Sequence, residues 1–298
     1  MKMKEATVTL ADGSVVWYQR GGKGPTIVDV HGTGFGYRNF GRLTPHMVDS
    51  FDVIDLDLPG YGRSTAKGPI GVTQWAAYVA EFIEKVIGGP THVHGTSMGA
   101  LVATIIAGNH PHVVKDLILT CCLFKYDRAA RHMRHTWKRG AVDSDMVQAA
   151  DLTAAAGFSR GFYDRPDALK ILNELRVAMG NNDAQSFVTG TESLEALDLS
   201  PLLPNLPRTL LIGGDEDQMT PPKPSKSGVG FDTAVSIIPD AELHIIPESG
   251  HYLVLERPEI TAELIKNFIL KPGANRRGAA KQSSEPTAEK PTAAEANQ

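Results

Sequence analysis

The segment 95–99, with the sequence GTSMG, constrains the fold of this chain more than any other stretch. Residues 91–94 before it are short and half β-branched, which predicts a strand. Residues 100–107 after it form an apolar run that stops shortly before Pro111, which predicts a buried helix. The two glycines allow a tight turn without a Cβ clash, so we expect the Ser97 hydroxyl to stand exposed on a strained backbone.

The remaining sequence alternates between predicted strands and predicted helices. Runs of β-branched or alternating residues predict strands over 6–10, 14–18, 26–30, 51–58, 115–119, 209–212 and 242–246. Apolar residues at helical spacing predict one helix from a cap at Thr73 to Gly88-Gly89, and another over 258–270. This order predicts parallel strands, right-handed crossovers and helices on both faces. The fold class is therefore α/β, with a mostly parallel central sheet.

Residues 121–200 break this alternation. Four helices are predicted there, over 126–138, 144–156, 166–179 and 183–197, with no clear strand among them. We therefore expect residues 1–120 and 201–270 to form the core, and 121–200 to form an all-helical insertion. Residues 271–298 are Ala, Glu, Lys, Pro and Ser with almost no bulky apolar residue, which predicts a disordered tail.

Composition narrows the class of protein. With 298 residues and 42% hydrophobic content the chain can bury a large core, and its net charge of −4 argues against a nucleic-acid partner. The two cysteines, Cys121 and Cys122, are adjacent, so no structural disulfide is expected. No signal-peptide core and no run of 18 apolar residues occurs, so we expect a cytoplasmic protein without a membrane partner. A small-molecule substrate is the expected partner, with a homodimer left open.

A serine hydroxyl is a poor nucleophile at neutral pH and needs a base that a carboxylate orients. The G-x-S-x-G turn between strand and helix resembles the nucleophile elbow of the α/β-hydrolase superfamily, over roughly residues 4–270. That resemblance implies the chain order Ser, acid, His, which Ser97, Asp217 and His251 follow. The family pattern G-x-x-D-x-x-x-P fits residues 214–221 and selects Asp217 over its neighbours Asp215 and Glu216.

The resemblance also implies an oxyanion hole and a cap. The glycine-rich loop 31–36 follows the strand 26–30, and we assign one oxyanion N–H to Thr33, with Gly34 as the competitor. The N–H of Met98 is the second donor. The helical insertion resembles the cap that roofs the site in this superfamily. No metal or organic cofactor is implied, and the histidines lack the spacing of a metal-binding H-E-x-x-H motif.

The substrate class is less constrained. Serine at the elbow argues against the haloalkane dehalogenase and epoxide hydrolase branches, which use Asp there. Ser-Met-Gly and the helical cap resemble meta-cleavage C–C hydrolases and enol-lactonases, but Ala100 replaces the usual glycine of the former. We therefore favour carboxylic-ester or lactone hydrolysis, and C–C or enol-lactone hydrolysis is the alternative. Proteins of this fold also include non-catalytic ligand binders and a cofactor-free oxygenase, but the intact triad favours a hydrolase.

Two further sets of residues are candidates for substrate contacts. An apolar pocket is predicted from Gly34, Phe35, Trp137, Met219, Tyr252 and Leu253, although core packing explains each one equally well. The first helix of the insertion is basic, through Lys125, Arg128, Arg131, Arg134, Lys138 and Arg139. We expect a solvated outer face for this basic helix, and the alternative is a guanidinium that pairs with a substrate carboxylate.

Overall fold

An eight-stranded sheet forms the centre of the computed structural model, which describes residues 2–68 and 70–271. The strand order is β1-β2-β4-β3-β5-β6-β7-β8. The strands are β1 (Lys4–Thr9), β2 (Val15–Gly22), β3 (Thr26–Val30), β4 (Asp52–Leu56), β5 (Thr91–Thr96), β6 (Val114–Thr120), β7 (Thr209–Gly214) and β8 (Ala241–Ile246). Strand β2 pairs antiparallel with both of its neighbours, β1 and β4, at one edge of the sheet. The other strands, β4, β3, β5, β6, β7 and β8 in spatial order, run parallel to one another. The predicted α/β class and mostly parallel sheet are confirmed.

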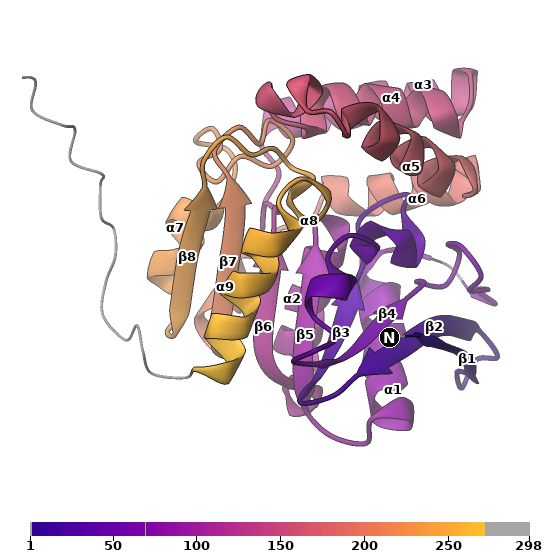
Figure 1. Ribbon diagram of the computed structural model, residues 1–298, viewed down its shortest axis with the longest axis vertical. Helices are drawn as coiled ribbons and strands as arrows, with labels where there is room; N and C mark the ends of the chain where they lie inside the picture. Colours follow the sequence, from indigo (N-terminus) through magenta and orange to yellow (C-terminus); the bar gives the residue numbers. More distant parts are fainter. Residues whose placement is uncertain (1, 69, 272–298) are drawn as a thin grey trace, which may run out of the picture.

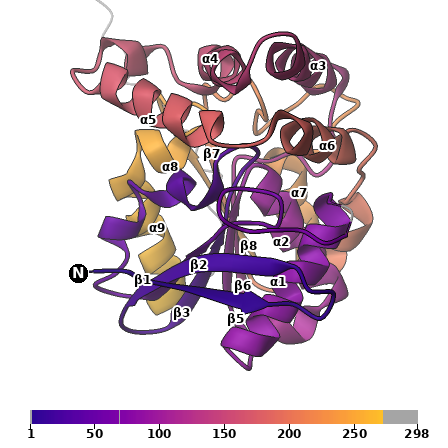
Figure 2. The same cartoon turned by 90° about the vertical axis from the view of Figure 1, so that its right-hand side faces the viewer.

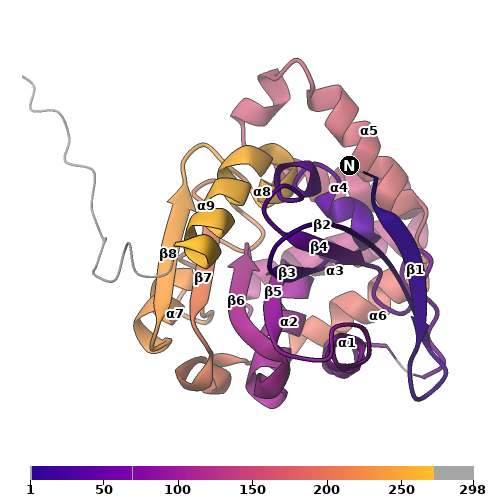
Figure 3. The ribbon, with the colours of Figure 1, turned by 60° about the horizontal axis from the view of Figure 1, so that its bottom comes forward.

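Helices cover both faces of this sheet (Figures 1 and 3). On one face lie α1 (Val72–Val86), α2 (Met98–Asn109) and α7 (Phe231–Ile237), and on the other lie α8 (Leu253–Glu256) and α9 (Pro258–Leu270). The apolar core divides accordingly into two clusters, one on each side of the strands. Because β5 is buried along its whole length between them, the turn that follows it is held from both faces.

Four helices form a separate layer over the carboxyl ends of the parallel strands (Figures 1 and 2). They are α3 (Arg128–Asp143), α4 (Met146–Gly157), α5 (Ala168–Gly180) and α6 (Ala184–Glu195). Three of them begin with an aspartate, Asp127, Asp145 or Asp183, whose side chain accepts a hydrogen bond from the N–H three residues later. Such caps satisfy N–H groups that have no partner within the helix.

Short elements were harder to predict. The helices α7 and α8 were not expected, nor were the 3-10 helices η1 (Gly36–Phe40), η2 (Thr44–His46), η3 (Pro111–Val113), η4 (Gly161–Asp164) and η5 (Ser200–Asn205). The predicted cap at Thr73 is wrong, because α1 begins at Val72 and its N-cap is Gly71, which has no side chain.

The predicted tail lies outside the described residues, apart from Lys271. Within the described ranges, no helix has the length and apolar character to cross a membrane.

Candidate active site

Ser97 occupies the tight turn between β5 and α2, with a φ of 54° and a ψ of −119°. A left-handed φ is rare for a residue with a side chain, and such strain is typical of functional sites. Both flanking glycines are required by close contacts. A Cβ on Gly99 would lie 2.0 Å from the carbonyl oxygen of Val30, and one on Gly95 would lie 2.2 Å from the carbonyl oxygen of Gly99. The turn therefore has no space for a larger residue at either position.

Three side chains form a chain of hydrogen bonds at this turn. Nε2 of His251 lies 2.9 Å from Oγ of Ser97, and its Nδ1 lies 3.0 Å from Oδ2 of Asp217. His251 follows β8, and Asp217 follows β7, so both come from the carboxyl edge of the sheet. The structure thus brings together the three residues that the sequence predicted, although they are up to 154 positions apart.

The carboxylate of Asp217 is buried and fully engaged. Its Oδ1 accepts hydrogen bonds from the backbone N–H groups of Met219 and Thr220, at 2.9 and 2.8 Å, and its Oδ2 accepts one from the Thr220 hydroxyl at 2.8 Å. Burial alone would raise the pKa of Asp217, but His251 and these donors hold it below its usual range. The group is therefore an anion at neutral pH. The Thr220 hydroxyl, which also lies 2.9 Å from Nδ1 of His251, was not predicted.

The two neighbouring acids lie elsewhere. Asp215 is exposed and accepts a hydrogen bond from the N–H of Ser249, and Glu216 is half-buried and accepts one from the N–H of Arg160. No hydrogen bond between either carboxylate and His251 occurs in the described part of the chain.

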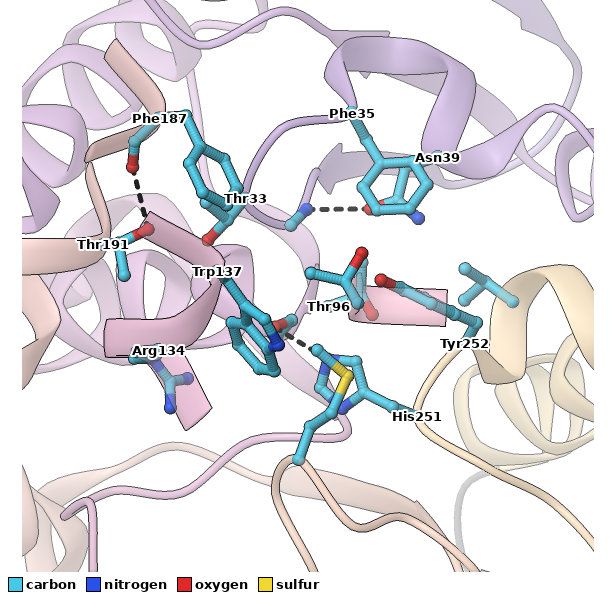
Figure 4. Close-up of a pocket in the computed structure, with 15 residues that line it drawn as sticks. Thr33, Phe35, Asn39, Thr96, Arg134, Trp137, Phe187, Thr191, His251 and Tyr252 are labelled. Atoms are coloured by element: carbon cyan, nitrogen blue, oxygen red, sulfur yellow. Dashed lines mark hydrogen bonds between the residues drawn. The ribbon is translucent and has the colours of Figure 1, made fainter. Parts of the chain in front are cut away.

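The expected oxyanion donors are backbone groups beside Ser97. Met98 is the first residue of α2, so its N–H has no acceptor within the helix. Thr33 lines the cavity at Ser97, and its loop is held by a 2.8 Å hydrogen bond from the N–H of Gly32 to Oδ1 of Asn39 (Figure 4). Gly34 has a φ of 86°, and a Cβ there would lie 3.1 Å from Cε of Met179 and 3.3 Å from the ring of Phe187.

A small cavity of about 30 Å³ lies at the triad, between the sheet and the α3–α6 layer. Of the predicted pocket residues, Phe35, Trp137, Met219 and Tyr252 line it. Gly34 and Leu253 are not among the residues that line it, so their assignment to this lining is wrong, and Leu253 is fully buried in the core. The lining residues that were not predicted are Gly32, Asn39, Thr96, Thr153, Phe187, Thr191 and Val254, and Arg134, one of the cations of the basic helix, also lines it.

The basic helix does not form a uniformly solvated face. Arg128 and Arg131 are exposed, as expected, and Lys125 and Arg139 form surface ion pairs. Arg134, however, is only 3% exposed and lines the cavity beside Trp137. For this residue the expected solvated position is wrong.

A second buried polar cluster lies behind the elbow. Nδ1 of His94 lies 2.8 Å from Oδ1 of Asp29, and its Nε2 lies 2.8 Å from the Thr120 hydroxyl, so the cluster ties β3, β5 and β6 together. Asp55 is also fully buried and accepts hydrogen bonds from the side chains of Gln19 and Thr44. Burial raises the pKa of Asp29 to about 7 and that of Asp55 well above its usual range, and it lowers the pKa of His94 to about 3.

One group of side chains has the composition of a metal site. Cys121, Asp217 and His251 each place one ligand atom within 4.8 Å of the others. Metals bind the thiolate, but burial raises the pKa of the Cys121 thiol well above its usual range, and Asp217 raises it further. Both ring nitrogens of His251 are also engaged, which makes these residues poor ligands.

Known proteins resemble this chain over most of its length. The model of the alpha/beta hydrolase family matches residues 28–264. A pyrrolizixenacetamide deacetylase from Xenorhabdus hominickii is 29% identical, over 84% of this chain and 92% of its own. A pimeloyl-(acyl-carrier protein) methyl ester esterase from Methylococcus capsulatus is 25% identical, over 85% of this chain and 98% of its own.

Solved structures agree with the sheet and its helices. A thermophilic esterase from Thermogutta terrifontis superposes with a TM-score of 0.78 at 21% identity, and the match covers 91% of this chain and 99% of the esterase. The family model spans well over half of the sequence. The chain therefore belongs to the alpha/beta hydrolase family, and it is an enzyme of the hydrolase class.

Proposed function

We propose that this enzyme hydrolyses carboxylic esters, including cyclic esters, through an acyl-enzyme on Ser97. The observation that carries this proposal is the continuous hydrogen-bonded path from Ser97 through His251 to Asp217. His251 takes the proton of the serine hydroxyl as Oγ attacks the acyl carbon, and it then gives that proton to the leaving alkoxide. Water cleaves the acyl-enzyme in a second step, with His251 again as the base.

The backbone around Ser97 supports this chemistry. The N–H groups of Met98 and Thr33 are the donors that would stabilise the oxyanion of the tetrahedral intermediate. Loss of one such donor raises the activation free energy by about 3–4 kcal/mol in a comparable site. Because Asp217 is held as a buried anion, it fixes the tautomer in which Nε2 of His251 is free to accept a proton.

The α3–α6 layer acts as a cap in this proposal. It places Trp137, Phe187 and Thr191 opposite Ser97, so these residues contact the acyl or alcohol part of the substrate. The names of two relatives support an ester substrate, since one is a methyl ester esterase and the other a thermophilic esterase. We assign no cofactor to this reaction.

A fluorophosphonate probe tests the proposal directly. It should label the wild-type enzyme on one residue, which peptide mass spectrometry should identify as Ser97. Ser97→Ala should not be labelled, and its kcat on short-chain esters should fall by about 10⁴-fold or more, as for other triad nucleophiles. Labelling at another residue, or near-normal ester turnover by the variant, would contradict the acyl-enzyme mechanism.

A further inference from the structure

Arg134 is a buried cation on the wall of the catalytic cavity. It projects from α3 beside Trp137 (Figure 4), and the residue is 3% exposed. Its guanidinium carbon lies 3.6 Å above the centre of the Tyr126 ring and 5.6 Å from that of Trp137. Stacking of this kind uses the face of the guanidinium and leaves the N–H groups at its edge available for hydrogen bonds.

Those N–H groups are largely without partners. A guanidinium has five donors, yet within the described ranges Arg134 makes one hydrogen bond, from Nη1 to the carbonyl oxygen of Ala130 at 3.2 Å. No carboxylate of the described chain lies within 4.0 Å of its nitrogens. Buried cations in proteins are normally paired, because an unpaired one loses its hydration without compensation. Burial also lowers the pKa of Arg134, although an arginine remains charged at neutral pH.

The acids nearest to Arg134 are committed to other groups. Glu195 lies 2.6 Å from Nζ of Lys138. Asp127 accepts hydrogen bonds from the N–H groups of Ala130 and Ser225, and Asp217 is bound to His251. The hydroxyl of Tyr126, whose ring lies under the guanidinium, is buried without a hydrogen-bond partner in the described structure. Glu195, Asp217 and Asp127 therefore favour the charged form of Arg134 from a distance, but within residues 2–68 and 70–271 no carboxylate forms an ion pair with it at the cavity.

We propose that Arg134 binds a carboxylate of the substrate, so that the preferred substrates are esters that carry an acidic group a short chain away from the scissile bond. This inference rests on the proposed ester hydrolysis at Ser97, because both residues line the same cavity. A planar guanidinium binds a carboxylate through two parallel hydrogen bonds. Arg134 is thus a specificity residue, and the neutral diester of the same acid is the disfavoured substrate.

Pairs of esters in which a second carboxyl group is either free or methylated test this proposal. The monomethyl and dimethyl esters of succinate, glutarate and adipate place the carboxylate on the acyl side, and 4-acetoxybutanoate with its methyl ester places it on the alcohol side. In at least one of these pairs, wild-type kcat/KM should be at least tenfold higher for the compound with the free carboxylate than for its methyl ester. For the symmetric dimethyl esters, kcat/KM is first divided by two, because each molecule carries two equivalent ester bonds. If every pair lacks this preference, the proposal is wrong.

The variant Arg134→Met keeps an apolar side chain of similar length against Tyr126 and removes the charge. It should lower the acid-to-diester preference by about 10- to 100-fold, as expected for a lost charged hydrogen bond. Arg131→Met, an exposed position on the same helix, is the matched control and should keep the wild-type preference. An equal loss of both substrates in Arg134→Met, with the preference unchanged, would assign Arg134 to packing and overturn the inference.

Two measurements separate this inference from the proposed function. Calorimetric binding of glutarate to the wild-type protein and to Ser97→Ala needs no turnover, and both should bind it more tightly than Arg134→Met does. If Arg134→Met fails to fold, Arg134→Lys keeps the charge but loses the paired donors, and it should bind glutarate more weakly than wild type. Fluorophosphonate labelling without any glutarate binding or acid preference would refute only the role of Arg134. Glutarate binding without labelling would refute only the acyl-enzyme.

Discussion

Replacement of Asp217 by asparagine should disable the base without disturbing the fold. Oδ1 of Asp217 lies in front of two backbone N–H groups, those of Met219 and Thr220. The asparagine carbonyl must take this place, because an amide NH₂ there would oppose two donors and leave both unsatisfied. That arrangement costs about 1–3 kcal/mol for each buried donor, or roughly 2–6 kcal/mol in total.

The asparagine NH₂ then points at Nδ1 of His251 and donates to it. Nδ1 must become an acceptor, so the ring proton moves to Nε2, which can no longer take the proton of Ser97. We therefore expect Asp217→Asn to lower kcat by about 10⁴-fold, a barrier increase of about 5 kcal/mol. The melting temperature should change little, because the substitution preserves shape and most hydrogen bonds.

The assay is initial-rate hydrolysis of an ester that the wild-type enzyme turns over, with circular dichroism melting of each variant. Asp215→Asn and Glu216→Gln are the controls and should be close to wild type. Thr220→Val removes a donor to the same carboxylate and should cost an intermediate 10- to 100-fold in kcat. If Asp217→Asn stays within tenfold of wild type, or if Asp215→Asn is the damaging change, the assignment of the acid is refuted.

Two further predictions concern the elbow and the cluster behind it. Gly99→Ala should destabilise the protein by at least about 1–3 kcal/mol in urea unfolding, because its Cβ would overlap backbone, whereas Gly89→Ala, with no atom within 4 Å of the added Cβ, should be neutral. The pKa of Asp29, raised to about 7, and that of Asp55, raised well above its usual range, mean that stability from their neutral forms is lost as pH rises through these values. The lowered pKa of His94, about 3, opposes this effect only below about pH 6.5, where an unfolded histidine binds a proton. Because His94 offsets only one of the two carboxyls, thermal melts should show wild-type stability falling as the pH rises above about 4, the ordinary pKa of an aspartate, and falling most steeply between about pH 6.5 and 7. Asp55→Asn should fall less steeply, and an equal slope for both proteins would refute this role.

Much of the fold was predictable because its signals are local. The bounds of β3 and α9 agree with the prediction, since each is a periodic apolar run between turn residues. The helix α7 was missed because it has seven residues and follows a loop rich in proline and glycine. The helix α8 has only four residues, too few for a periodic pattern.

The triad was predictable for a different reason. Chain order and turn spacing identify Ser97, Asp217 and His251, and these depend on positions along the sequence. The contribution of Thr220 depends on how the loop after β7 folds back, so its hydroxyl reaches both Asp217 and His251. A threonine directly before a pair of prolines carries no such signal by itself. Side-chain contacts of this kind were therefore outside the reach of sequence patterns.

The burial of Arg134 in α3 is indicated by its position in the sequence and not by its charge. Counting six cations suggests a solvated face, but the buried residues of α3 are Ala130, Arg134, Trp137 and Ala141. Their spacing of four, three and four is the stripe of a helix packed along one side. Arg134 is the one charged residue in that stripe, so the apolar neighbours predict its burial even though its own type does not. An arginine is rarely placed on a buried stripe without an anion to meet it, and here the space beside it is the catalytic cavity. A charged residue at the buried position 134 is therefore the feature of this sequence that most strongly indicates a negatively charged substrate.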